Sequence, residues 1–87
     1  MANFSKRHYI AVAEVLRIRY IASRKRLDGA VKTGADEVTY ASAESWHGQV
    51  IETMEDLVEL FERDNSAFNR NHFIAVVEGR KALNSRP

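Results

Sequence analysis

Apolar residues recur every three or four positions between residues 43 and 63, the spacing that places them on one side of an α-helix. The apolar set is Trp46, Val50, Met54, Leu57, Val58 and Phe61. The other side of this helix is acidic and holds Glu52, Glu55, Asp56, Glu59 and Glu62. We therefore predict an amphipathic helix over 43–63, with the apolar side facing a core.

The segment 6–27 has apolar residues on two opposite sides of a helix. One side, expected to face the core, holds Tyr9, Ala13, Leu16, Tyr20 and Leu27. The opposite side holds Val15, Ile18 and Ala22. Because a helix in a small bundle usually presents a polar side to water, we expect this second side to contact another polypeptide. Asp28-Gly29 should end the helix, since glycine readily adopts the left-handed conformation of a C-cap.

The stretches 4–14 and 68–78 resemble each other and match at six of eleven positions. Each begins with a phenylalanine followed by a residue that caps helices well, Ser5 in one copy and Asn69 in the other. The repeat predicts helix starts at Lys6 and Arg70, and we expect the third helix to cover 70–82. Residues 84–87 should fray. Residues 28–42 show no sustained period and are predicted to be a connector between the first two helices.

These elements predict an all-α fold, a three-helix domain with two long helices and a shorter C-terminal one. Eighty-seven residues form one domain, 1–87, which buries only about 60 to 65 per cent of its unfolded surface. A second chain would cover more, so we expect a homo-oligomer. The chain has no cysteine, which excludes disulfides and thiol chemistry. Charged residues interrupt every apolar run, so no membrane span is expected, and the composition is compatible with a cytoplasmic protein.

Charge is distributed unevenly along the chain. Residues 1–27 hold seven lysines and arginines against one acid, residues 28–69 hold ten acids against two bases, and residues 70–87 hold four bases against one acid. Two interpretations remain open. The basic and acidic helices could simply pack against each other, or one charged face could serve a partner or a nucleic acid.

Catalysis is not expected. His8, His47 and His72 have no spacing typical of a zinc site, and no nucleophile motif, carboxylate pair or glycine-rich phosphate loop is present. His8 and His72 occupy the third position of their helices, where a role in the helix start is more common. We therefore predict no catalytic residues, no metal and no cofactor, and little room for a buried pocket.

The residues around the second turn carry a family resemblance. Asp64-Asn65, Phe68-Asn69-Arg70 and Phe73-Ile74-Ala75 resemble the ending of small helical proteins encoded by phages and prophages of actinobacteria. The beginnings are similar too, at His8-Tyr9, Ala13 and Leu16. This chain departs at Ser66, Asn69 and Val77, where that family tends to have Pro, Asp and Cys. The resemblance implies a small accessory protein in a bacterial cytoplasm, and it carries no activity because the family has no settled biochemical role.

Two functions follow as hypotheses. The first is protein–protein interaction, by self-association or by binding a host bacterial protein, through Val15, Ile18 and Ala22 and the acidic Glu55 and Glu59. The alternative is a DNA-binding regulator in which 43–63, the turn and 70–82 act as a helix-turn-helix. Its possible contacts to the nucleic acid are Arg17, Arg24, Asn69, Arg70 and Asn71. The acidic second helix disfavours this alternative, because it would repel the phosphates of the DNA.

Overall fold

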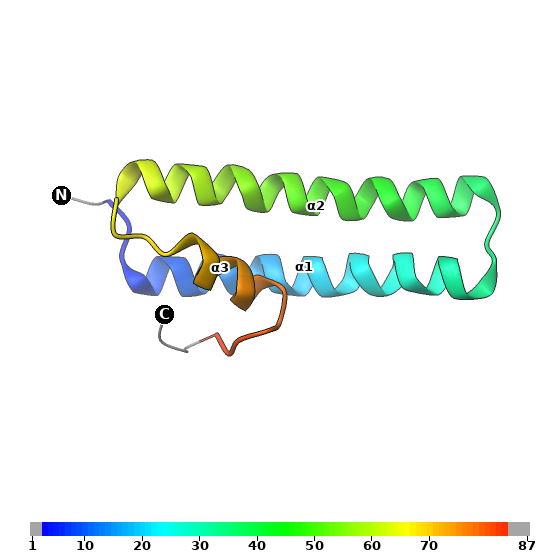
Figure 1. Ribbon diagram of the computed structural model, residues 1–87, viewed down its shortest axis with the longest axis horizontal. Helices are drawn as coiled ribbons and strands as arrows, with labels where there is room; N and C mark the ends of the chain where they lie inside the picture. Colours follow the sequence, from blue (N-terminus) through cyan, green and yellow to red (C-terminus); the bar gives the residue numbers. More distant parts are fainter. Residues whose placement is uncertain (1–2, 84–87) are drawn as a thin grey trace.

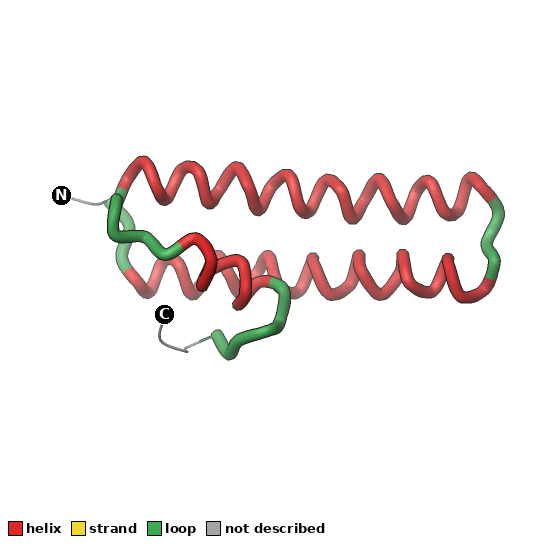
Figure 2. The backbone as a smooth tube through the Cα atoms, viewed as in Figure 1, coloured by secondary structure: helices red, strands yellow, loops and turns green. Residues whose placement is uncertain are grey.

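The computed structural model describes residues 3–83, and this part of the chain is all helical apart from its turns and ends (Figure 1). Two long helices, α1 (Lys6–Thr33) and α2 (Glu37–Asp64), run antiparallel as a hairpin. A short helix, α3 (Arg70–Val77), lies against the half of the hairpin that holds the start of α1 (Figure 2). The molecule is a flat rod of 50 × 22 × 16 Å. The all-α, three-helix prediction is confirmed. The expectation about 84–87 lies outside the described residues.

The predicted connector at 28–42 is wrong. The first helix continues to Thr33 and the second begins at Glu37, so only residues 34–36 join them. Gly34, with φ of 65°, ends α1 in place of Gly29, and the Asp36 carboxylate caps α2 by accepting a hydrogen bond from the Thr39 amide at 2.8 Å. Gly29 stays helical because an interior glycine costs only about 1 kcal/mol, which packing can offset.

A heptad pattern explains why both helices extend so far. Core-facing residues alternate in steps of three and four along each helix, the spacing of a two-stranded coiled coil. We call the resulting contact the seam. It is formed by Tyr9, Ala13, Leu16, Tyr20, Ser23, Leu27 and Ala30 of α1 and by Ala43, His47, Val50, Met54, Leu57 and Phe61 of α2. Contacts of Tyr9 with Phe61 and of Ser23 with His47 fix the antiparallel register.

The small residues Ala30 and Ala43 carry the seam to the tip of the hairpin. Both are buried, although each lies inside or next to the segment that was predicted to be a connector. An alanine offers little apolar area, so it adds little to a hydrophobic pattern, yet it lets two helices approach closely. The hydrophobic periodicity of 28–42 is therefore weak in the sequence. It is still sufficient to keep most of these residues helical when α1 and α2 pack together.

Helix α3 is shorter than predicted and ends at Val77, not at residue 82. Gly79, with φ of 80°, turns the chain, and the Arg80 amide bonds back to the Ala75 carbonyl at 2.8 Å. The predicted inward residues Phe73, Val76 and Val77 are buried. They belong to the same core cluster as Phe61, whose ring centroid lies 5.7 Å from that of Phe73. Beyond α3, Glu78 and Arg80 line a groove with Tyr20 and Asp28 of α1.

Candidate functional site

Four small or apolar side chains form an exposed line along α1, which we call the outer strip: Ala11, Val15, Ile18 and Ala22. Val15 retains 61% and Ile18 64% of its accessible surface. These positions fall between the seam positions and point away from α2, since steps of four, three and four repeat the heptad spacing on the back of the helix. Within residues 3–83, the three apolar residues predicted to meet a partner, Val15, Ile18 and Ala22, are therefore uncovered.

Helix α3 does not cover the outer strip because it packs on a different flank of α1. Ile10 and Ala13 share a pocket with Phe73 and Val76 of α3. Further along, Gly79 faces the side chains of Arg17 and Ile21, which lie within 3.9 Å of the position that a Cβ would take. The strip thus has neither α2 nor α3 above it.

The structure separates the predicted interface residues into two groups. Glu55 and Glu59 are exposed on the back of α2, whereas the outer strip lies on the back of α1. The two helices face each other across the seam, so their backs point in opposite directions. One flat partner cannot cover both groups. The acidic back of α2 is a separate surface.

The side chains proposed to contact a nucleic acid are also divided. Arg17 and Arg24 lie seven residues apart on one flank of α1, and Arg24 is 3.5 Å from the Asp28 carboxylate. The Tyr20 hydroxyl and the Asp28 charge raise the pKa of the Arg24 guanidinium. Asn69 accepts a hydrogen bond from the His72 amide at 3.0 Å and so acts as the predicted N-cap of α3.

Helix α3 offers few side chains to a duplex. Arg70 and Asn71 are its exposed residues, and Arg70 lies 3.3 Å from the carboxylate of Glu62 on α2. The rest of this eight-residue helix is buried or half-buried. A recognition helix normally presents three or four side chains to base edges. The helix-turn-helix reading therefore has little geometric support.

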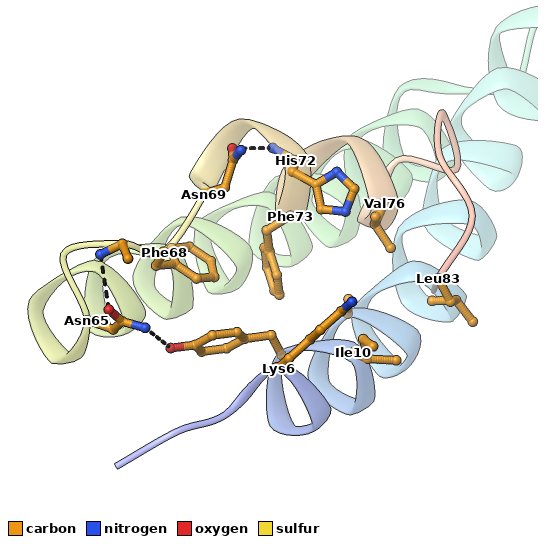
Figure 3. Close-up of a pocket in the computed structure, with 12 residues that line it drawn as sticks. Lys6, Ile10, Asn65, Phe68, Asn69, His72, Phe73, Val76 and Leu83 are labelled. Atoms are coloured by element: carbon orange, nitrogen blue, oxygen red, sulfur yellow. Dashed lines mark hydrogen bonds between the residues drawn. The ribbon is translucent and has the colours of Figure 1, made fainter. Parts of the chain in front are cut away.

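An apolar pocket between α1 and α3 was not anticipated from the sequence (Figure 3). Its volume is about 250 Å³, just below the range typical of small-molecule sites. Phe68 and Phe73 line one side of it, and Lys6 and Ile10 of α1 line the other. Asn65 closes one end, where its amide nitrogen donates to the Tyr9 hydroxyl at 3.5 Å. The lining carries little polar chemistry, so it is suited to an apolar side chain more than to a reaction.

The side chains of His8 and His47 have structural partners. The Ser5 backbone N–H donates to His8 Nδ1 at 2.9 Å, which is the helix-start role expected for this position. His47 is buried in the seam, where its Nδ1 lies 2.8 Å from Ser23 Oγ. Among residues 3–83, no three metal-ligating side chains come together. In the same range, no helix has the length and hydrophobicity needed to span a bilayer.

Comparison of the chain with family models, with curated proteins and with solved structures found no match.

Proposed function

We propose that this protein acts by binding another polypeptide through the outer strip of α1. The observation that carries the proposal is the exposure of Val15 and Ile18, at 61% and 64%, on a helix whose two other flanks are occupied by α2 and α3. Aliphatic side chains grouped in this way are disfavoured in water and mark contact sites on small proteins.

The surroundings of the strip support protein contact more than nucleic-acid contact. Helix α1 carries eight basic and two acidic residues, and α2 carries eight acidic residues and one basic. In a helix-turn-helix complex, the acidic α2 would lie against the phosphate backbone, which would repel it. An adjacent protein can instead match both the apolar strip and the charges beside it.

The resemblance to phage-encoded proteins supports a role as an accessory protein in a bacterial cytoplasm, where the partner would be a second copy or a host protein. The proposal contains no catalytic step. The acidic back of α2, with Glu55 and Glu59, offers a second surface for a basic partner.

Site-specific photocrosslinking in bacterial cells tests this proposal. A photoreactive phenylalanine analogue would replace Ile18 in one variant and Val38 in a control variant. Val38 is also an exposed aliphatic residue, at 77%, but lies near the tip of the hairpin. We expect a covalent adduct with another polypeptide from position 18 and much less from position 38. The mass of the adduct distinguishes a second copy from a host protein. Equal yields at the two positions, or no adduct at position 18, would contradict the proposal.

A further inference from the structure

We propose that the outer strip binds the outer strip of a second copy, with the two α1 helices antiparallel. This inference rests on the proposed function, because it names the partner of the same surface. A two-fold axis would pass between residues 16 and 17 of each α1. This type of contact is self-complementary, so every pair of residues occurs twice.

The axis brings the residues of the strip into register. Val15 faces Ile18 of the second copy, and Ala11 faces Ala22. Each layer therefore combines either two large aliphatic side chains or two small ones. The alanines allow the backbones to approach at both ends of the strip, and Val15 and Ile18 fill the centre, as in knobs-into-holes packing.

Charges on one flank of the strip match in this register. Arg7 and Asp28 lie on the same flank of the strip, near its two ends, and both are exposed. On this flank, Asp28 of the second copy is the nearest residue to Arg7, displaced by two residues, or about 3 Å, along the helix axis. Glu14, on the same flank, meets the aliphatic Ile21 and not a second acid. Flanking pairs of this kind set partner orientation in antiparallel helix pairs.

Other alignments of the same strip bring like charges together. A shift by one heptad places Glu14 opposite either Glu14 or Asp28 of the second copy. A parallel pair stacks Lys25 on Lys25 and aligns the two helix dipoles, both of which are unfavourable. The antiparallel register with its axis between 16 and 17 avoids each of these conflicts. It leaves Lys25 opposite His8 at the margins, where both side chains reach water.

The size of the contact predicts a weak dimer. The distance from residue 7 to residue 28 is about 30 Å along the helix, and a helix is about 10 Å wide, which gives a footprint of roughly 300 Å² per copy. This is well below the area of standard interfaces and corresponds to transient association. We expect a dissociation constant on the order of 10 to 100 µM.

Sedimentation equilibrium from 5 to 500 µM measures this association. Ile18→Glu places two carboxylates at the centre of the dimer, so we expect the dissociation constant to rise on the order of 100-fold. Val38→Glu is the matched control. Its dissociation constant should stay within about twofold of the wild-type value, because position 38 lies outside the proposed contact. A wild-type protein that stays monomeric at 500 µM would overturn the inference. Position 18 could still crosslink to a host protein in that case, so the two proposals fail separately.

Orientation and register need their own measurements. The chain has no cysteine, so Lys32→Cys provides a single site for a spin label. Pulsed electron resonance should give about 45 Å between the two labels in the antiparallel dimer, from the rise per helical residue. A parallel dimer, or one with both hairpin tips at one end, would give less than about 25 Å and would overturn the orientation.

A charge-exchange series tests the register. Arg7→Glu and Asp28→Arg should each weaken the dimer severalfold, and the double variant should recover most of the wild-type affinity. Asp28→Arg also removes the contact of Asp28 with Arg24 within one copy, which the double variant cannot restore. Recovery in the double variant therefore reports the contact between copies. If the double variant lost as much binding free energy as the two single variants together, the register would be overturned.

Discussion

Ser23 Oγ lies 2.8 Å from His47 Nδ1 in the middle of the seam, where both side chains are buried. Ser23 Oγ also donates its proton to the Tyr20 carbonyl at 3.1 Å, so the bond to His47 requires the Nδ1–H tautomer, with the imidazole as donor. The aromatic ring of Tyr20 packs on the same imidazole, with centroids 5.1 Å apart. This pair sits beyond the part of the hairpin that α3 covers, and it joins α1 to α2 there by a polar contact.

Removing one member of this pair should destabilise the fold. Ser23→Ala leaves the buried N–H of His47 without its acceptor, so we expect a loss of about 1–3 kcal/mol in the free energy of unfolding. Ser45→Ala, on the exposed side of α2, is the control and should change it by less than about 0.5 kcal/mol. Urea denaturation followed by circular dichroism measures both.

The double variant Ser23→Ala/His47→Leu tests the cause of that loss. Replacing both polar partners with apolar groups removes the unsatisfied donor, so most of the stability should return. A double variant that is less stable than Ser23→Ala would show that packing of the imidazole, and not the hydrogen bond, stabilises the seam.

Two glycines near the tip should respond to alanine with opposite signs. Gly29 is helical and has open space where a Cβ would be, so Gly29→Ala should stabilise the protein by about 0.5–1 kcal/mol. Gly34 has equally open space but a φ of 65°, so Gly34→Ala should destabilise it by about 1 kcal/mol. Thermal unfolding of the two variants measures this difference. If 28–33 were a mobile connector, Gly29→Ala would have no stabilising effect.

Alanine substitutions at two neighbouring residues near the end of α2 should lower the stability by very different amounts. Phe61 is 1% exposed and its ring contacts those of Phe4, Tyr9, Phe68 and Phe73. Phe61→Ala should cost about 3–5 kcal/mol, enough to unfold much of a domain this small. Leu60 is 39% exposed, and Leu60→Ala should cost less than about 1 kcal/mol. Similar losses at the two positions would contradict the placement of the core.

Acid should weaken the contact between the N-terminal segment and the end of α2. The backbone N–H groups of Asn3 and Phe4 donate to the Asp64 carboxylate at 3.0 and 3.1 Å, and these bonds lower the pKa of Asp64. A carboxyl with a lowered pKa in the folded state stabilises the fold above its unfolded pKa of about 3.9 and loses that effect as the pH falls through the folded value.

Comparison with Asp64→Asn isolates this contribution. The wild type should be the more stable protein at pH 6, and the difference should shrink as the pH is lowered below about 4. Urea unfolding at a series of pH values measures the difference. A difference that stays constant down to pH 2 would mean that the charge on Asp64 does not stabilise the fold.

The sequence alone was sufficient for the features that depend on local chemistry. The helix starts at Lys6 and Arg70, the Asn69 cap, the inward set of Phe73, Val76 and Val77 and the helical core of 43–63 were all predicted and observed. Caps and periodicity act over a few residues, so they can be read without a partner helix. The exposed side of α1 at Val15 and Ile18 belongs to the same group, because the helical period places these residues opposite the side that faces α2.

Tertiary structure alone decided the rest. Residues 28–33 and 37–42 are helical because Ala30 and Ala43 are buried between the two helices. Alanine side chains are too small to give these residues a clear hydrophobic periodicity in the sequence. The Ser23–His47 bond joins residues that are far apart in the chain, and neither residue is apolar. The separation of Glu55 and Glu59 from the outer strip depends on how α1 and α2 are rotated about the seam. Each of these features depends on contacts between residues that are distant in the sequence. A hydrophobic pattern shows on which side of a helix a residue lies, but it does not show which residues of another helix it contacts.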